Sequence, residues 1–280
     1  MSLKTRSLGA GLLIHRGPAG AAKLARVLEP LRRVTATRYV APLREGGSLP
    51  GLLEADDDGM YVTKFSGAGQ GAGALVAEVL AGELARAIGL PVPELVVIDV
   101  APELGHAEPD PEIQELLAAS PGINLGMDFL PGSLPFAVPP DPPIDPEQAA
   151  DVVWFDTLVT NVDRTHRNPN LIVWGGRTWL IDHGASFFRQ HAPGTLAATA
   201  HDGMPMLGDH VLLPYAGSIR DADERLASRA LAAAGAAVAL VPPDWLGVNP
   251  SARRGDLVAF LSARLAAPRG FVEEIERARG

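Results

Sequence analysis

The most informative stretch of the sequence is TNVDRTHRNPNLIVWGGRTWLIDHG, residues 160–184. Two short β-like runs, LIVW and TWLID, flank Gly175-Gly176, and this pair favours a tight β-hairpin because both glycines can adopt positive φ. A hairpin returns its second strand to the place where the first strand began. We therefore expect Asp182, at the end of the second strand, to lie beside the loop of residues 163–170 that precedes the first strand.

Three oxygen-bearing side chains would then meet at the open end of this hairpin, namely Asp163, Asn168 and Asp182. Carboxylate and amide oxygens suit a hard divalent cation such as Mg²⁺, and a further carboxylate beside it can accept a proton from a hydroxyl. Phosphoryl transfer uses such a set, with an Asn five residues after the catalytic Asp and a metal-binding Asp on a following strand. Asn168 follows Asp163 by five residues. The pattern predicts Asp163 as the base and Asn168 and Asp182 as metal ligands, although Asn and Asp also shape ordinary turns.

The residues before the hairpin match a second requirement of phosphoryl transfer, a strand lysine oriented by a helix glutamate. Lys64 lies in MYVTKF, residues 60–65, which alternates like a strand, although an edge-strand lysine that discourages aggregation gives the same pattern. Glu78 and Glu83 are its two candidate partners, in a helix expected over residues 75–88. Helical periodicity favours Glu83, because it falls inside the apolar stripe, where a buried carboxylate needs a partner.

Two glycine-rich loops are candidates for holding nucleotide phosphates. REGGSLPG, residues 44–51, lies between expected strands and offers backbone N–H groups at Gly46, Gly47 and Ser48. SGAGQGAG, residues 66–73, follows the lysine strand. Glycine clusters are mostly turns, so the sequence does not choose between these two loops.

The order of the expected elements predicts an α+β fold in two lobes. Residues 1–130 are expected to form a small lobe with an antiparallel sheet and one main helix, and a proline-rich connector follows at 131–145. Residues 146–280 are expected to form a larger, mostly helical lobe that contains the hairpin. A further helix is expected over residues 21–33.

The start of the second lobe carries a helix signal. Asp145, Pro146 and Gln148 match an N-cap, a first-turn proline and a capping-box partner. The apolar positions that follow, from Val152 to Val159, lie on one helical face. We therefore expect a buried helix immediately before the Asp163 loop.

The composition limits the classes of function. The chain has 33 acidic and 24 basic residues, a formal net charge of −9 and no cysteine. These values disfavour a nucleic-acid-binding surface and exclude disulfides, thiolate metal sites and a cysteine nucleophile. No uncharged run reaches the roughly 18 residues of a membrane helix, and the N-terminal apolar stretch is too short for a signal peptide. We therefore expect a cytoplasmic protein that does not enter a membrane.

Taken together, Lys64, LVAEVLAGELARAIGLPVPE, NVDRTHRN and LIDHG resemble the HipA-like kinase family, which is more distantly similar to phosphatidylinositol kinases and protein kinases. The resemblance covers residues 38–188. It implies a two-lobed kinase fold that uses ATP and Mg²⁺. It also implies transfer of the γ-phosphoryl group to a hydroxyl acceptor, either a protein Ser or Thr or a small molecule.

The resemblance also assigns roles to individual residues. Asp163 matches the catalytic Asp of the family, Asn168 and Asp182 match its metal ligands, and Lys64 matches its phosphate-binding lysine. Glu78 falls where the family places its helix glutamate, against the periodicity that favours Glu83. The resemblance therefore implies that Glu78 is the partner of the lysine.

The remaining implied features concern the nucleotide and the partners. Asp128, Phe129 and Leu130, in DFLPG, are implied to form a hinge whose backbone meets adenine, and Ser48 corresponds to a flap serine that is autophosphorylated. Residues 182–184 read DHG where protein kinases have DFG. The packing switch that protein kinases build on DFG is therefore not assumed for this chain. The chain is also shorter than the toxin of the family, which leaves an antitoxin partner and an aminoacyl-tRNA synthetase substrate open.

Two other functions remain open from the sequence. A pseudokinase would bind nucleotide without transferring phosphate, although retention of Lys64 together with the three oxygen-bearing residues disfavours this. A metal-dependent hydrolase would use Asp163, His166, Asp182 and His183 with Zn²⁺ or Mn²⁺. The other histidines lack ligand spacing and are expected at ordinary surface or loop positions: His15, His106, His191, His201 and His210.

Overall fold

The computed structural model of the chain describes residues 28–43, 49–69, 71–105, 108–191 and 195–280. Gly46, Gly47 and Ser48 of the first glycine-rich loop, and most of the helix expected over residues 21–33, lie outside these ranges. The described end of that segment, residues 28–33, is not helical. Strand β1 (Arg32–Pro42) already begins there, because it is hydrogen-bonded to another strand on each edge.

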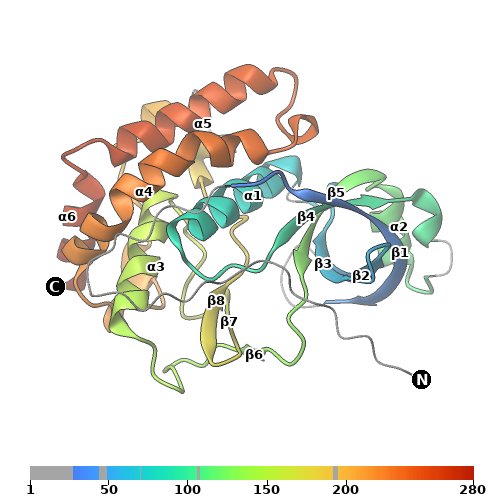
Figure 1. Cartoon of the computed structure of the whole chain (residues 1–280), viewed down its shortest axis with the longest axis horizontal. Helices are drawn as coiled ribbons and strands as arrows, with labels where there is room; N and C mark the ends of the chain where they lie inside the picture. Colours follow the sequence, from blue (N-terminus) through green and yellow to red (C-terminus); the bar gives the residue numbers. More distant parts are fainter. Residues whose placement is uncertain (1–27, 44–48, 70, 106–107, 192–194) are drawn as a thin grey trace, which may run out of the picture.

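Five strands from the first half of the chain form one closed sheet, at the right of Figure 1. Their order is β1, β2 (Gly51–Ala55), β3 (Met60–Lys64), β5 (Gly122–Asp128) and β4 (Leu95–Val100). Most neighbours are antiparallel, but β1 and β4 run parallel, so the expectation of an antiparallel sheet is only partly correct. The long β1 bridges β2 and β4, helped by two register shifts that let the strand bend.

A small apolar core lies inside this closed sheet. Its largest members are Leu53, Tyr61 and Phe65, which are almost fully buried. Helix α2 (Pro111–Ala118) covers the core with Ile113 and Leu117. This core holds β3 in place and with it Lys64, the last residue of the strand.

Helix α1 (Gly71–Ile88) belongs to a second, larger core that it shares with the helices of the C-terminal half. Figure 1 shows α1 between the closed sheet and α4 (Ile219–Leu240). Nearly all of its residues from Ala74 onward are buried, including both Glu78 and Glu83. Because the helix has no exposed face, its hydrophobic periodicity cannot identify which glutamate has a partner.

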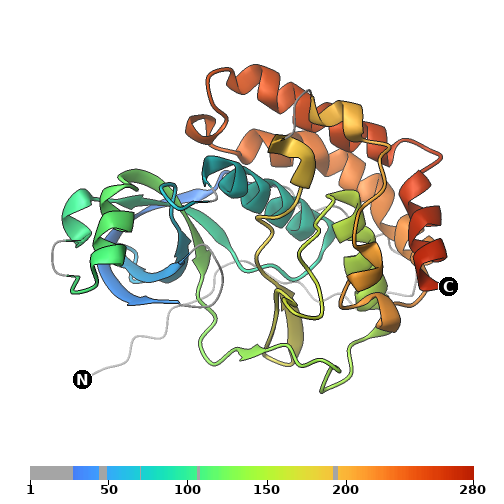
Figure 2. The same ribbon diagram turned by 180° about the vertical axis from the view of Figure 1, so that it is seen from behind.

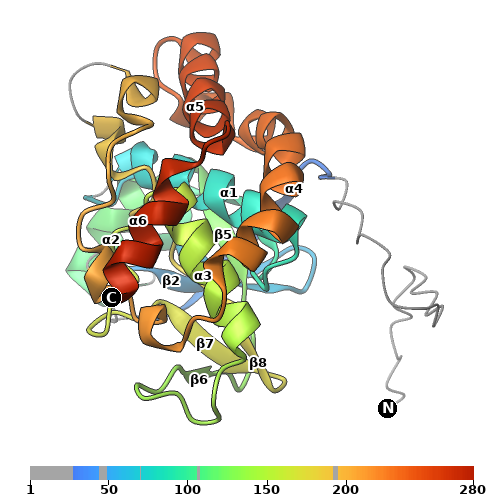
Figure 3. The same ribbon diagram turned by 90° about the vertical axis from the view of Figure 1, so that its left-hand side faces the viewer.

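The C-terminal half is mainly helical. Figure 3 shows α3 (Pro146–Leu158), α4, α5 (Pro250–Leu265) and α6 (Gly270–Arg279) together at the end of the molecule that carries the C-terminus. Short 3₁₀ segments, among them Leu207–Asp209 and Leu213–Tyr215, fill the connection before α4. Within the described part of the chain, none of the helices is both long enough and apolar enough to span a bilayer.

Helix α3 begins where the sequence predicts. Asp145 accepts the N–H of Glu147 at 3.0 Å, and Pro146 occupies the first turn. Gln148, expected as a capping-box partner, instead donates from Nε2 to the carbonyl oxygen of Thr178 at 2.9 Å. It therefore joins α3 to the hairpin, a contact between segments 30 residues apart that the capping pattern does not reveal.

The expected hairpin is present. β7 (Leu171–Trp174) and β8 (Arg177–Leu180) pair in antiparallel register, with Leu171 opposite Leu180. Gly175 and Gly176 form the turn with φ of 56° and 73°. A short strand, β6 (Leu134–Pro135), adds a third member to this sheet, which lies at the lower edge of the molecule in Figure 2.

Candidate active site

Asp163 lies in the loop between α3 and β7, where two amide side chains hold its carboxylate. Its Oδ2 accepts hydrogen bonds from Nδ2 of Asn168 at 2.7 Å and from Nδ2 of Asn170 at 3.3 Å. Its own N–H donates to Oδ1 of Asn161 at 3.2 Å. The N–H of Thr165 bonds to the carbonyl oxygens of both Asp163 and Asn168. This turn folds the loop so that Asp163 and Asn168 meet.

The hairpin carries Asp182 to the same loop. Beyond the end of β8, the N–H of Ile181 donates to the carbonyl oxygen of Asn170 at 3.1 Å, so the ladder continues by one bond. Arg164 also joins the two segments, because its guanidinium donates to the carbonyl of Asn170 and, at 3.3 Å, to that of Ile181. Asp182 then adopts a φ of 53°, in the left-handed region, which turns the chain away from the strand direction.

Lys64, at the end of β3, reaches two carboxylates from distant parts of the chain. Its Nζ contacts Oε1 of Glu78 in α1 and lies 2.6 Å from Oδ1 of Asp182. The other oxygen of Glu78, Oε2, accepts the N–H of His183 at 2.9 Å. Glu83 instead pairs with an arginine of the same helix, at 3.4 Å. The structure therefore places Glu78, and not Glu83, beside the lysine.

One ammonium faces two carboxylates in this largely buried cluster. Burial opposes the charge of Lys64, but Glu78 and Asp182 outweigh it and raise the pKa of the lysine. Burial also opposes the charge of Asp182, but Lys64 outweighs it and lowers the pKa of Asp182 to about 2. Burial raises the pKa of Glu78 even though Lys64 acts in the opposite direction, and Asp182 adds to the rise. A further cation near Asp182 would stabilise the ionised forms of both carboxylates.

Asn168 and Asp182 offer the oxygen donors that Mg²⁺ prefers. The amide nitrogen of Asn168 faces Asp163, so its carbonyl oxygen points away from that carboxylate. Asp182 holds Lys64 through Oδ1, and 36% of its side chain is exposed. Within the described ranges, no three His, Asp or Glu side chains form a group that would hold a metal by themselves. The donor set fits a Mg²⁺ ion that also takes oxygens from water and a phosphate.

The histidines of the alternative hydrolase set do not form a metal site with these carboxylates. His166 is exposed, whereas the ring of His183 is buried and lies edge-on to Phe155 with 6.3 Å between ring centroids. Burial lowers the pKa of His183 to about 3, with Arg164 adding to the effect, so the ring is neutral near pH 7. Its Nε2 has no hydrogen-bond partner among the described residues. His183 supports the site through its backbone N–H and its packing.

Gly184, the last residue of DHG, leaves room for the lysine cluster. A Cβ at this position would lie 3.1 Å from Oε1 of Glu78 and 3.6 Å from Oδ1 of Asp182. A side chain here would therefore crowd the carboxylate of Glu78, whereas the distance to Asp182 is that of an ordinary contact. The sequence shows the motif but not this contact, because Glu78 belongs to a helix more than a hundred residues earlier.

Backbone donors at the start of the second glycine-rich loop are already used. The N–H of Ser66 donates to Oδ1 of Asn124 at 2.7 Å, and the N–H of Gly67 donates to Oγ of Ser120 at 3.0 Å. A Cβ on Gly67 would lie 2.4 Å from the carbonyl oxygen of Ala119, so only glycine fits this approach. These contacts fasten the loop to the connection between α2 and β5. Which of the two glycine-rich loops receives phosphates stays a prediction.

The expected hinge begins at the last residue of β5. The N–H of Phe129 donates to the carbonyl oxygen of Met60 at 2.9 Å, and the N–H of Asp128 donates to that of Glu94 at 2.8 Å. The N–H of Leu130 bonds to no other residue in the part of the chain that is described. Of the three hinge residues, Leu130 is thus the one with a backbone donor left for a ligand.

A buried ionic group that the sequence does not predict lies beneath the Asp163 loop. Asp156, on α3, is fully buried and lies 2.5 Å from Nε of Arg164 and 3.0 Å from Nε2 of His210. Burial opposes its ionisation, but Arg164 and His210 outweigh it and hold the pKa of Asp156 well below its usual range. His210 lies in a loop, but it is not an ordinary surface or loop histidine, since it is 1% exposed and its ring binds Asp156. The available signal is that Asp156 falls between Val152 and Val159 on the apolar face of the helix.

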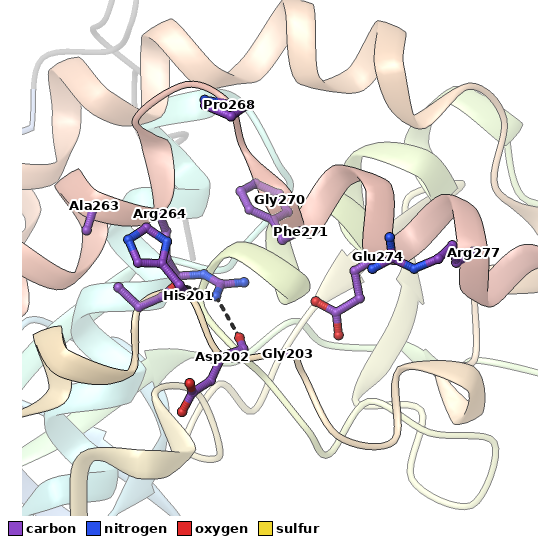
Figure 4. Close-up of a pocket in the computed structure, with 11 residues that line it drawn as sticks. His201, Asp202, Gly203, Ala263, Arg264, Pro268, Gly270, Phe271, Glu274 and Arg277 are labelled. Carbon is purple, nitrogen blue, oxygen red and sulfur yellow. Dashed lines mark hydrogen bonds between the residues drawn. The ribbon is translucent and has the colours of Figure 1, made fainter.

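A cavity of about 350 Å³ lies in another part of the molecule, between α5, α6 and the loop of residues 200–203 (Figure 4). Arg264 forms its buried side and donates to three backbone carbonyls, including that of Thr157 in α3 at 2.6 Å. Glu274 of α6 accepts a backbone N–H from the same loop region at 2.7 Å. These contacts fasten α5 and α6 to the rest of the helical part, and the cavity is not lined by Lys64, Asp163 or Asp182.

The chain is similar to known kinases. A family model described as HipA-like kinase matches residues 37–265. Among solved structures, the chain is similar to the proinflammatory kinase CtkA of Helicobacter pylori, with a TM-score of 0.55 and 13% sequence identity over 89% of this chain and 98% of that one. No curated protein matches the sequence. At this identity the structural likeness concerns the fold alone.

Proposed function

This chain belongs to the HipA-like kinase family, and we propose that it transfers the γ-phosphoryl group of ATP, with Mg²⁺, to a hydroxyl acceptor. The acceptor would be a Ser or Thr of a protein or the hydroxyl of a small molecule. One observation carries the proposal: Nζ of Lys64 contacts Glu78 and, 118 residues away in sequence, Asp182. Phosphoryl transfer by kinases requires this lysine–glutamate pair and a metal-binding Asp together.

We propose the two-lobed architecture of kinases, with residues 1–130 as the first lobe, 131–145 as the connector and 146–280 as the second lobe. The fold shared with CtkA supports this division. So does the separation of the closed sheet from helices α3 to α6. Helix α1 joins the two lobes, because it lies in the first range but packs in the core of the second.

Lys64 would bind the phosphate oxygens of ATP. Its ammonium is already satisfied by Glu78 and Asp182, so a nucleotide phosphate would compete with Asp182 for it. Glu78 has a second anchor in the N–H of His183 and would stay in place during this exchange. The role of Glu78 is therefore to hold the ammonium while the lysine changes its other partner.

Asn168 and Asp182 would hold the metal. When bound, Mg²⁺ supplies positive charge against the phosphate oxygens during transfer. The contact of Asn168 with Asp163 turns the amide oxygen outward, and the left-handed backbone at Asp182 fixes the direction of its carboxylate. The two ligands are thus oriented by the chain itself.

Asp163 would orient the acceptor hydroxyl and take its proton. Both amide donors, on Asn168 and Asn170, go to Oδ2. Among the described residues none donates to Oδ1, which leaves that oxygen for the hydroxyl. Two donors on one oxygen also hold the carboxylate plane, and a base in a fixed orientation is effective in general base catalysis.

The adenine would lie against the hinge of Asp128, Phe129 and Leu130. The available N–H of Leu130 would donate to a ring nitrogen, while the other two N–H groups stay in the sheet. The first glycine-rich loop, with Gly46, Gly47 and Ser48, would cover the phosphates, because the second loop is fastened at Ser66 and Gly67.

Thermal unfolding and a phosphoryl-transfer assay, each with and without Mg²⁺ and ATP, test the proposal. Mg²⁺ and ATP at 100 times the Kd should stabilise the native state by about 2.7 kcal/mol. Stabilisation together with transfer of labelled phosphate to an acceptor or to water supports a kinase. Stabilisation with no phosphate transferred or released points to a pseudokinase. Absence of any stabilisation by ATP contradicts the proposal. Hydrolytic activity that needs Zn²⁺ or Mn²⁺ but no nucleotide would favour the metal-dependent hydrolase.

A pair of glutamate variants separates the two candidate partners of the lysine. Glu78→Gln is expected to lower kcat by about tenfold to a hundredfold, because the ammonium loses the charge that holds it. Glu83→Gln is the matched control, since both glutamates are buried on α1, with 3% and 6% exposure, and both belong to an ion pair. Steady-state kinetics at a temperature far below the unfolding midpoint should show wild-type kcat for Glu83→Gln. Equal losses in both variants would contradict the assignment.

A further inference from the structure

Asp156, Arg164 and His210 form a buried group next to the candidate active site, and each is at most 1% exposed. Asp156 is the acceptor at its centre. Its carboxylate accepts hydrogen bonds from Nε of Arg164 at 2.5 Å, Nη2 of Arg164 at 3.4 Å, Nδ2 of Asn161 at 3.1 Å and Nε2 of His210 at 3.0 Å. A carboxylate held by four donors in a buried setting has a single orientation.

Arg164 links this group to the reacting residues, because it directly follows Asp163. While Nε and Nη2 face Asp156, Nη1 donates to the carbonyl oxygens of Asn170 and Ile181. Asn170 contacts the carboxylate of Asp163, and Ile181 directly precedes Asp182. The direction of one guanidinium therefore sets the spacing between the loop of Asp163 and the segment of Asp182.

His210 is fixed in one tautomer by its neighbours. Its Nδ1 accepts the N–H of Leu212 at 3.1 Å, so the hydrogen is on Nε2, which donates to Asp156. The same segment also supports the catalytic loop through its backbone. The N–H of Val211 donates to the carbonyl oxygen of Arg164 at 3.0 Å, and His210 forms an isolated β-bridge with Thr165.

We propose that Asp156 and His210 are positioning residues, which act through Arg164 to fix the relative placement of Asp163 and Asp182. The inference rests on the proposed phosphoryl transfer. Among the described residues, neither side chain contacts Lys64, the carboxylate of Asp163 or Asp182. They therefore influence the reaction indirectly, mainly through Arg164 and also through Asn161, which binds Asp156 and accepts the N–H of Asp163.

The expected consequence of loosening this group is mainly slower transfer of phosphate from bound ATP. A base and a metal ligand that move apart by about 1 Å can cost roughly a hundredfold in rate. The nucleotide contacts proposed for Lys64 and Leu130 do not depend on Arg164. A positioning role therefore predicts that kcat falls by a larger factor than KM for ATP rises, whereas general destabilisation would lower the amount of folded enzyme.

Two substitutions of His210 each keep one of its two side-chain hydrogen bonds and remove the other. In His210→Gln the amide nitrogen takes the place of Nε2 and keeps the donor to Asp156, but the acceptor for Leu212 is lost. In His210→Asn the amide oxygen takes the place of Nδ1 and keeps that acceptor, but the donor to Asp156 is lost. We expect kcat of His210→Asn to fall by about tenfold to a hundredfold and kcat of His210→Gln to stay close to wild type. His201→Asn, an exposed histidine of the same loop region, is the control.

Hydrogen exchange of backbone amides gives a readout that does not need activity. We expect faster exchange in residues 161–170 and 181–184 of His210→Asn, with the closed sheet and α1 unchanged, and no such change in His210→Gln. If the variants show this difference in exchange but the wild-type protein transfers no phosphate, the kinase proposal is contradicted and the role of His210 in placing the two segments is supported. Equal kcat and equal exchange in both variants would overturn the inference, as would faster exchange spread over the whole helical part.

Discussion

Replacement of Asp163 by alanine is expected to lower kcat for phosphoryl transfer by about a hundredfold to ten-thousandfold, because the reaction loses its general base. The fold should be unaffected. The carboxylate is only half-buried. Of its two amide partners, Asn168 is exposed and free to turn to water, and Asn170 keeps the backbone carbonyl oxygen of residue 163 as an acceptor. The measurement is kcat with ATP and Mg²⁺ at saturating concentrations, together with the thermal midpoint of the same protein sample.

Asp163→Asn is the control for this change, because it keeps the shape of the side chain and removes the basic oxygen. Asp163→Asn should retain the stabilisation by Mg²⁺ and ATP that the wild type shows, since Lys64 and Asp182 are intact and the new amide oxygen can still accept the hydrogen bond from Asn168. Unchanged turnover in either variant would exclude Asp163 as the base. Loss of nucleotide stabilisation would instead place Asp163 in the binding of ATP.

Asp156→Ala is expected to lower the free energy of unfolding by about 3–5 kcal/mol, because it leaves a buried guanidinium without its counter-ion. Arg164 is 1% exposed, and its remaining described partners are backbone carbonyls. Nε2–H of His210 also loses its acceptor. Because the pKa of Asp156 is lowered in the folded state, its contribution is present above the ordinary value of 3.8 and is lost as the pH falls below it.

Asp151→Ala provides the matched control on the same helix. Asp151 pairs with Arg225 at 2.6 Å, but the side chain of Arg225 is 34% exposed and can be solvated when the carboxylate is removed. We expect a loss of about 1 kcal/mol or less there. Urea unfolding at pH 7, followed by circular dichroism, compares the two variants. Equal losses in the free energy of unfolding would contradict the prediction that the buried ion pair of Asp156 contributes more to stability than the partly exposed pair of Asp151.

The hairpin and its neighbourhood are predicted from sequence because their causes are local. Gly175 and Gly176 permit the two positive φ angles of a tight turn, and the turn sets the register that pairs Leu171 with Leu180. The same register places Ile181 opposite Asn170, and the N–H of Ile181 donates to the carbonyl oxygen of Asn170. The start of α3 at Asp145 and Pro146 is predicted for the same reason, since capping depends on residues within one turn.

The choice between Glu78 and Glu83 shows where local rules fail. Periodicity assumes that a helix has one buried face, but α1 is enclosed by the sheet on one side and by the C-terminal helices on the other. Both glutamates are buried, and the position of Lys64 at the end of β3 selects Glu78. The parallel pairing of β1 with β4 is likewise not predictable from local patterns, because it joins segments more than 60 residues apart.

The reactive groups of this protein can be predicted from local patterns with local physical causes: the Asp–Asn interval of five residues, the two-glycine turn and the strand lysine. Which charged groups meet depends instead on how the whole chain folds. Lys64 with Glu78 and Asp182, and Asp156 with Arg164 and His210, are buried groups assembled from separate elements. A buried charge requires a partner, but its position in the sequence does not specify which one, because the partner is brought to it by the packing of the whole chain.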